Sequence, residues 1–300
     1  MFIDHNGNTW YKGNLHTHST LSDGWLPYEL VVKRYREAGY DFLSVTDHGI
    51  VSETLEENDF ITLSGCEYDF SKQTKMYNQK RAMIIHVNGI GFTSAPDIQN
   101  SSDGLTLKHI VDEIHKKDGI AFLCHPAWSR NIPDDIWEST DLDGVEILNA
   151  GAEIHCGVGD STYIVDQMAF GGYMLPVIAA DDSHHYSGED CKAYTLARTD
   201  DFSRNGIIQA IRENKIIASE GPWLQVMEDK GNLFIECTPV SYIFVYTNMW
   251  GSKMIEGKNL TCGRVSLNDW SGDIHYYRVM VADEHGKRAW TSPMRTQSAV

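Results

Sequence analysis

The sequence predicts an α/β protein: a main domain of parallel strands joined by helices, followed by a small antiparallel β domain. From about Gly13 to Ile217, short apolar runs alternate with stretches of helical period, which is typical of strand–helix–strand units. After Ser219 the chain changes to β-branched and aromatic runs separated by Gly, Asn and Asp. A length of 300 residues with 42% apolar residues suffices for a large core. We therefore expect one domain over residues 1–218 and a second over residues 219–300.

Seven short apolar runs are the expected strands of the main domain. Helices are expected over Pro27 to Gly39, over Leu105 to Gly119 and after Asp200, because each stretch has helical period; the first also has Pro near its start and Gly at its end. The expected strands are Gly13–His16, Phe42–Thr46, Ile61–Glu67, Ala82–Val87, Ala121–His125, Gly144–Leu148 and Val177–Ala180.

Three further runs are the expected strands of the second domain, which the chain enters through Ala218–Trp223. Their aromatic side chains recur at strand spacing and are expected in the core of a β-sandwich. A role in binding carbohydrate, in dimerisation or as a lid remains open. The runs are Leu233–Trp250, Cys262–Trp270 and His275–Trp290.

The net charge and the N-terminal residues limit the functions that the protein can have. The net charge of -17, without a Lys/Arg cluster, argues against an extended nucleic-acid surface, although bound cations would let the protein bind small phosphate esters. The N-terminal residues lack the pattern of a secretory leader, and no uncharged apolar run reaches about 18 residues. The six cysteines contain no Cys-x-x-Cys pair. We expect a soluble, cytoplasmic protein without membrane contact; its oligomeric state is not indicated.

Histidines gather at the expected strand ends. Of the thirteen histidines, seven lie at or just beyond the C-terminal end of an expected strand. In a closed parallel barrel those ends open on one face, so these side chains would converge there. Because side chains alternate along a strand, the spacing His16-x-His18 points both imidazoles the same way, and Asp182-x-His184 repeats it. The seven are His16, His18, His48, His86, His125, His184 and His185.

Carboxylates stand at the same strand ends. Imidazole together with carboxylate suits Zn²⁺, Mn²⁺ or Fe²⁺, whereas Ca²⁺ prefers an all-oxygen set. The candidates exceed the four ligands of one tetrahedral ion, which implies two or three metal ions. The carboxylates are Asp23, Asp47, Glu67, Asp181 and Asp182.

Each of these residues also has a simpler explanation. A lone His-x-His pair can be incidental, His125 can be a core histidine, and Glu67 can cap a helix. Their coincidence at successive strand ends favours the metal site. Cys66 and Cys124 are expected to point away from it and to pack in the core. His155 lies on a loop after a strand, and a place for it in the pocket remains open.

Six segments, in this order, resemble the successive motifs of the PHP-domain metallohydrolases, the polymerase and histidinol phosphatase superfamily. They cover about Gly13–His185, and the first is similar to the branch that contains nucleotide bisphosphate phosphatases and carbaryl-hydrolase-like proteins. The resemblance implies a distorted (β/α)7 barrel of TIM-like type with two or three divalent ions at its mouth. The segments read NLHTHSTLSDG, SVTDHG, SGCEY, IIHVNGIG, FLCHPAW and AADDSHH.

The resemblance also implies a ligand set. Carried over by position, His16 and His18 bind the first metal, which Asp182 completes, and Glu67 bridges two metals. Asp23 stands where many relatives have a histidine. The remaining ligand positions correspond to Asp23, His48, His86, His125 and His184.

The implied activity is hydrolysis of a small phosphomonoester, such as a nucleotide. The nucleophile is a hydroxide held between the metals, whose charge also neutralises the phosphoryl oxygens. Either His184 or His185 would assist the leaving oxygen. Arg130 either binds the phosphate or is a surface residue. Its segment departs from the His-Pro-Gly-Arg form of many such phosphatases.

Two alternatives remain open. The same metals would also polarise the carbonyl of a carboxylic or carbamic ester. Trp128, Trp137 and Tyr163 would then form an aromatic pocket, although packing in the core is the simpler use of each. In the other alternative the barrel is a catalytically silent metal-binding module, as in some PHP domains appended to polymerases. Such a module is expected to lack ligands, whereas every motif position here carries a suitable side chain.

Overall fold

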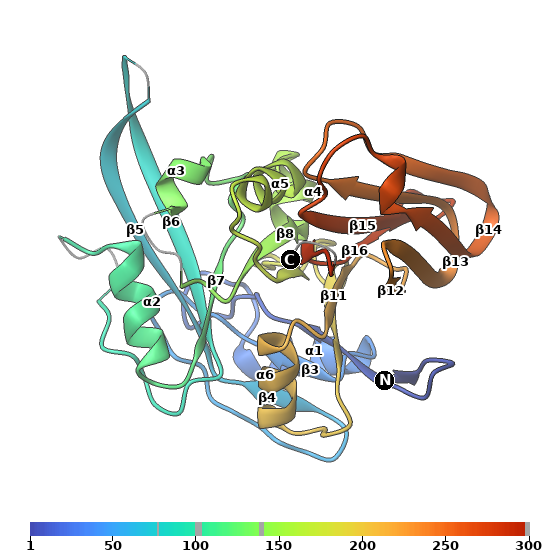
Figure 1. Ribbon diagram of the computed structural model, residues 1–300. Helices are drawn as coiled ribbons and strands as arrows, with labels where there is room; N and C mark the ends of the chain where they lie inside the picture. Colours follow the sequence, from blue (N-terminus) through green and yellow to red (C-terminus); the bar gives the residue numbers. More distant parts are fainter. Residues whose placement is uncertain (77, 100–103, 138–140, 298–300) are drawn as a thin grey trace.

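The protein is a mixed α/β structure built on two sheets (Figure 1). The computed structural model describes residues 1–76, 78–99, 104–137 and 141–297. The larger sheet combines strands from both ends of the chain, and the smaller sheet comes from the middle.

The larger sheet begins with three parallel strands: β2 (Thr9–Asn14), β3 (Phe42–Ser44) and β4 (Ile61–Leu63). The short strand β1 (Phe2–Ile3) pairs with β2. Helix α1 (Tyr28–Glu37) joins β2 to β3 and starts directly after Pro27, where a fixed φ suits a helix start. The prediction of a first helix, and of a strand at Phe42, is confirmed.

The smaller sheet contains five strands in sequence order. Strands β5 (Gly65–Met76) and β6 (Gln79–Ile90) form a long antiparallel hairpin that extends beyond the rest of the sheet in Figure 1. Strand β7 (Ile120–Leu123) is antiparallel to β6, whereas β8 (Gly144–Asn149) and β9 (Val177–Ala180) continue in parallel.

The predicted strand Ile61–Glu67 is therefore wrong as a single strand. It breaks at Ser64, and its two parts lie in different sheets. The parallel direction expected for the strand at Ala82–Val87 is also wrong, because β6 is antiparallel to both neighbours. In β5, Tyr68 and Phe70 are buried, whereas Asp69 is half-buried and Ser71 is exposed, a pattern that antiparallel strands with one solvated face adopt.

Helices lie between and after these strands. The expected second and third helices are α2 and α6, which begin with hydrogen bonds from His109 N to Thr106 and from Gly206 N to Ser203. Helices α4 and α5, with the short α3, were not expected. The bounds are α2 (Leu107–His115), α3 (Pro133–Ile136), α4 (Ala150–Cys156), α5 (Thr162–Phe170) and α6 (Arg204–Arg212).

Two unexpected strands, β10 (Tyr194–Arg198) and β11 (Ile216–Ser219), carry the larger sheet into the C-terminal region. Strand β10 is antiparallel to β2, and β11 pairs with β10 on one side and with β16 on the other. The C-terminal strands are antiparallel, as expected: β12 (Leu224–Asp229), β13 (Asn232–Thr247), β14 (Lys253–Ser266), β15 (Tyr276–Ala282), β16 (Arg288–Trp290) and β17 (Met294–Arg295). The division between residues 218 and 219 falls inside β11, and a domain boundary there stays a prediction.

The strand ladders of the described residues do not close into a barrel. Two isolated bridges nevertheless join the sheets. One pairs Thr17 with Ser183, just beyond the ends of β2 and β9, and the other pairs His48, beyond the end of β3, with Glu67 near the start of β5. Between the sheets lies one buried apolar cluster with side chains from both, including Leu15, Phe42, Phe122 and Ile178. The carboxyl ends of strands far apart in sequence therefore meet at one place.

Candidate metal centre

The segments that follow β2 and β9 run side by side and carry five of the predicted ligands. His18 N donates to Ser183 O at 3.0 Å, and Asp182 N donates to His16 O at 2.9 Å. The Asn14 side chain fastens both segments, because its Oδ1 accepts from Asp181 N at 2.9 Å and its Nδ2 donates to His16 O at 2.8 Å. This pairing brings His16, His18 and Asp182 together.

Four ligating atoms converge at the centre of the site: His16 Nε2, His18 Nε2, Glu67 Oε2 and Asp182 Oδ1. The nitrogens are 3.3 Å apart, each lies 3.1 Å from Asp182 Oδ1, and they lie 3.3 and 3.2 Å from Glu67 Oε2. A tetrahedral ion with bonds of about 2.0–2.1 Å separates its ligand atoms by about 3.3–3.4 Å. These separations therefore fit one divalent ion.

Unpartnered atoms in the same place support this fit. Asp182 Oδ1 is buried and accepts no hydrogen bond, although the two imidazole nitrogens lie beside it. His48 Nδ1 is likewise buried without a hydrogen bond and lies 3.4 Å from Glu67 Oε2. Buried polar atoms without partners are costly in water-excluded surroundings unless a ligand satisfies them. A cation would satisfy both atoms.

The other predicted ligands surround this set. On the side of Glu67 Oε1, His86 Nδ1 lies at 2.7 Å and His125 Nε2 at 3.3 Å. On the outer side, Asp23 Oδ2 lies 3.7 Å from His48 Nε2 and 3.5 Å from His184 Nε2. The structure thus brings all nine predicted metal ligands together around Glu67, which faces histidines with both oxygens.

The electrostatics follow from burial and opposite charge. Burial opposes the charged form of His18, but the carboxylates of Asp182 and Glu67 outweigh it and raise its pKa to about 9. Burial likewise opposes the charged form of Glu67, yet His16 and His86 hold its pKa well below the usual value. Without metal, the site therefore balances carboxylates against protonated imidazoles. A metal ion must displace those protons.

Two carboxylates at strand ends have structural roles. Asp47 accepts hydrogen bonds from Ser19 N at 2.8 Å and Ser22 Oγ at 2.7 Å, which holds the turn that carries Asp23. Asp181 accepts from the backbone N–H groups of residues 191–193 and from Tyr35 Oη. Burial raises the pKa of Asp181 to about 7.

One functional residue was missed by the sequence analysis. Glu146 on β8 is fully buried, and its Oε1 accepts from His16 Nδ1 at 2.6 Å. Its Oε2 accepts from His125 N at 2.7 Å and from Asn149 Nδ2 at 3.0 Å, and Asn149 also donates to Asp182 Oδ2. Because a carboxylate only accepts, His16 keeps a proton on Nδ1, so Nε2 is the nitrogen that would give up its proton to a metal ion in the centre. A single acid inside the apolar run Gly144–Leu148 was the available signal.

The centre forms the floor of a cavity of about 330 Å³. His155, left open by the sequence, lines this cavity together with His185 and Trp128. Arg130 is exposed and is not among the described lining residues, so the structure does not bring it to the cavity. Trp137 and Tyr163 are not among them either. Cys66 and Cys124 are buried, as expected. The expectation that Cys124 points away from the site is wrong, because its Sγ lies within 4.8 Å of ligand atoms of His16 and Glu146.

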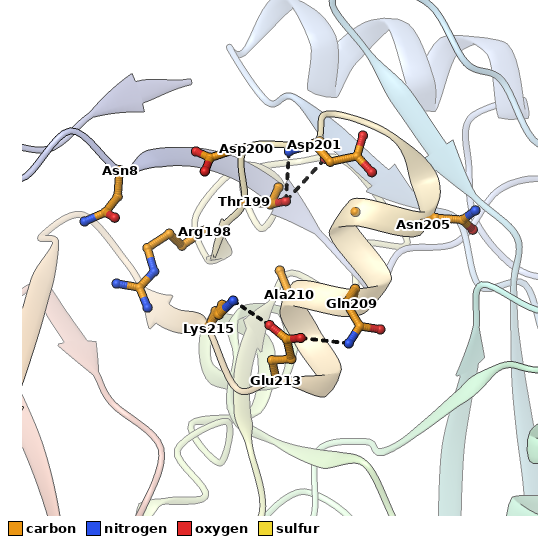
Figure 2. A pocket seen from close by; sticks show the side chains of 11 residues that line it. Asn8, Arg198, Thr199, Asp200, Asp201, Asn205, Gln209, Ala210, Glu213 and Lys215 are labelled. Carbon is orange, nitrogen blue, oxygen red and sulfur yellow. Dashed lines mark hydrogen bonds and ion pairs between the residues drawn. The ribbon is translucent and has the colours of Figure 1, made fainter.

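A larger hollow of about 670 Å³ lies elsewhere, between α6 and the loop that follows β10 (Figure 2). Two of its charged side chains pair with each other: Glu213 lies 2.5 Å from Lys215 and also accepts from Gln209 at 2.9 Å. None of the metal-ligand groups found among the described residues lies there. We therefore assign the candidate site to the smaller cavity.

No protein-family model and no curated protein matches the sequence. Among solved structures, a two-domain Bacteroides vulgatus protein containing a predicted PHP-like metal-dependent phosphoesterase is similar over 97% of each chain, with 15% identity and a TM-score of 0.53. An amidohydrolase from Chromobacterium violaceum with bound sulfate is similar over 68% of this chain and 96% of its own, with 15% identity and a TM-score of 0.41. The likeness to the Bacteroides protein shows a shared fold over the whole chain.

No helix in the described part of the chain is both long and apolar enough to span a membrane.

Proposed function

We propose that the protein is a metal-dependent hydrolase of the PHP superfamily that releases phosphate from a small phosphomonoester, such as a nucleotide. The observation that carries the proposal is the set of four ligating atoms from His16, His18, Glu67 and Asp182, whose separations match one divalent ion at the floor of an open cavity. The fold shared with a protein that contains a predicted PHP-like phosphoesterase supports it. The narrower placement, in the branch of nucleotide bisphosphate phosphatases and carbaryl-hydrolase-like proteins, rests on the motif resemblance alone.

The proposal assigns two or three ions of Zn, Mn or Fe to the nine ligands. Glu67 would bridge, because Oε2 faces His16 and His18 while Oε1 faces His86 and His125. When bound, the ions supply a water of lowered pKa and positive charge for the phosphoryl oxygens.

The structure offers a basis for choosing the proton donor. His184 Nδ1 donates to the carbonyl of Asp182 at 3.0 Å, and its Nε2 faces Asp23, which suits a ligand. His185 also lines the cavity and is more exposed than His184; the centroids of the two rings are 6.3 Å apart. We assign the protonation of the leaving oxygen to His185.

The proposal includes a distorted (β/α)7 barrel, formed by β2, β3, β4 with β5, and β6 to β9. The isolated bridges Thr17–Ser183 and His48–Glu67 support this closure. It also includes a cytoplasmic location, which six free cysteines favour.

The test is phosphate release from nucleoside monophosphates and simple monoesters by protein loaded with Mn²⁺ or Zn²⁺. Glu67→Gln keeps the side-chain volume and should lower release by at least about 100-fold, because it removes the shared carboxylate. Glu113→Gln, on α2, is the matched control and should behave like wild type. Release of the alcohol or phenol from carboxylic or carbamic esters, without phosphate release, would favour the ester hydrolase. No turnover at all with metals bound would favour the silent module.

A further inference from the structure

The cavity wall beyond the predicted ligands contains no permanent cation. Apart from those ligands and His185, the described lining residues are Trp128, Gly151, Ala152, His155 and Cys156, and no described lining residue is Lys or Arg. Under the proposed function, one phosphoryl group would be neutralised by the ions on the floor. The remainder of the substrate would meet an indole, small side chains and two imidazoles.

Trp128 is held at a fixed place beside the floor. Its ring centroid lies 5.0 Å from that of His125 and 6.0 Å from that of His86. The loop that carries it is closed by Ser129 N donating to His125 O at 3.0 Å, and Asn131 Nδ2 ties the loop to Ile84 O at 2.7 Å. The indole is 40% exposed, so part of its surface is open to a bound molecule.

The part of the wall around His155 is unfavourable for a second anion. His155 Nε2 lies 3.6 Å from Glu189 Oε2, so a carboxylate already stands beside this imidazole. Glu189 is buried and accepts from the backbone N–H groups of His185, Tyr186 and Ser187. These donors keep it ionised at neutral pH, with its pKa lowered to about 2 despite burial. A second phosphate would approach this carboxylate without a free cation to pair with.

We propose that the site selects phosphomonoesters whose organic part is a flat aromatic ring system that stacks on Trp128 and carries no second anionic group. This inference rests on the proposed function and narrows its substrate class. Trp128 is then the residue that determines specificity, because aromatic stacking contributes at a distance from the bond that breaks.

The test compares benzyl phosphate with cyclohexylmethyl phosphate, which share an alkyl leaving oxygen and differ in the flatness of the ring. Wild type should prefer the benzyl ester in kcat/KM. Trp128→Ala should lower the benzyl to cyclohexylmethyl ratio by about 5-fold or more, since stacking on an aromatic side chain contributes at least that much, and Trp128→Phe should restore most of it. Trp250→Ala, which removes a 91% exposed indole far from this cavity's lining, is the control and should leave the ratio unchanged.

A second comparison tests the charge requirement, with adenosine 5'-monophosphate against adenosine 3',5'-bisphosphate. The monophosphate should have the lower KM. Metal content measured on every variant shows whether Trp128→Ala has altered metal binding. If it has, Trp128→Phe and Trp128→Leu replace it in the comparison of benzyl with cyclohexylmethyl phosphate. An unchanged ratio in Trp128→Ala and Trp128→Leu, which lack an aromatic ring, or a lower KM for the bisphosphate, would overturn the inference while leaving the phosphatase in place. No phosphate release from any ester would instead overturn the proposed function, and this inference with it.

Discussion

Replacing Glu146 by glutamine should switch the tautomer of His16 and thereby weaken metal binding. Glutamine keeps one acceptor oxygen and gains an NH2 group. Its oxygen is expected to face His125 N and Asn149 Nδ2, because that orientation keeps two hydrogen bonds rather than one. The NH2 group then faces His16 Nδ1, which must accept, so the proton moves to Nε2 and points into the ligand set.

The magnitude follows from the contacts of Glu146. Loss of an outer partner of a ligating histidine typically lowers metal affinity by about 10- to 100-fold, which is about 1.4–2.8 kcal/mol. Glu146→Gln retains the two other hydrogen bonds and should cost little folding free energy. Glu146→Ala leaves the buried donors of His125 and Asn149 without this acceptor, at about 1–3 kcal/mol each. The two variants should therefore share weak metal binding but differ in stability.

Isothermal titration of Zn²⁺ or Mn²⁺ into metal-free protein measures the affinity, and urea unfolding measures the stability. Glu113→Gln serves again as the control. Wild-type affinity in Glu146→Gln would refute the assignment of the His16 tautomer. Weak binding only in proportion to lost stability would indicate a purely structural role for Glu146.

Two further predictions concern pH and the C-terminal region. Because His18 has a pKa of about 9, metal affinity should rise as pH increases from 6.5 to 9, as fewer protons must be displaced. The stability of the metal-free protein should change in the opposite direction, because the folded-state pKa of His18 is above its unfolded value near 6.5. The contribution of protonated His18 to stability is therefore complete below pH 6.5 and is lost as pH rises through about 9. Titration calorimetry and melting curves across this range measure both, and a flat affinity profile would contradict the prediction. Separately, Asp166→Ala should destabilise the protein by about 3 kcal/mol in urea unfolding, because Asp166 Oδ1 and Oδ2 pair with the fully buried Arg278 at 2.9 and 2.8 Å. The exposed Asp269→Ala is the control, and a loss below about 1 kcal/mol would show that Arg278 finds other partners.

The convergence of the candidate ligands was predictable because their residue types are distinctive and their positions follow strand ends. The partner of His16 was not, since Glu146 lies within a strand and its role depends on which strand lies beside β2 in space. Strand direction was equally out of reach: the run Ala82–Val87 has the same apolar character in either direction, and its antiparallel pairing is set by the hairpin with β5.

Strands β10 and β11 were missed for a related reason. Runs of five and four residues are too short to display a period, and their extended form is stabilised by pairing with β2 and β16, which lie far away in sequence. Helix α4 has only seven residues and begins directly at the end of β8, where an apolar run hides the change of period.

The place of β11 between β10 and β16 has a consequence for the growing chain. Once residue 184 has left the ribosome every candidate ligand exists, but β11 lacks its second neighbour until residues 288–290 are made. At about 5–20 residues per second, the stretch from residue 219 to residue 288 takes about 4–14 s to synthesise. During that time an open strand edge is available for pairing with other chains. A chain that stops before Arg288 would hold all its candidate ligands and still carry that open edge, so it should associate with other chains more readily than the full-length chain.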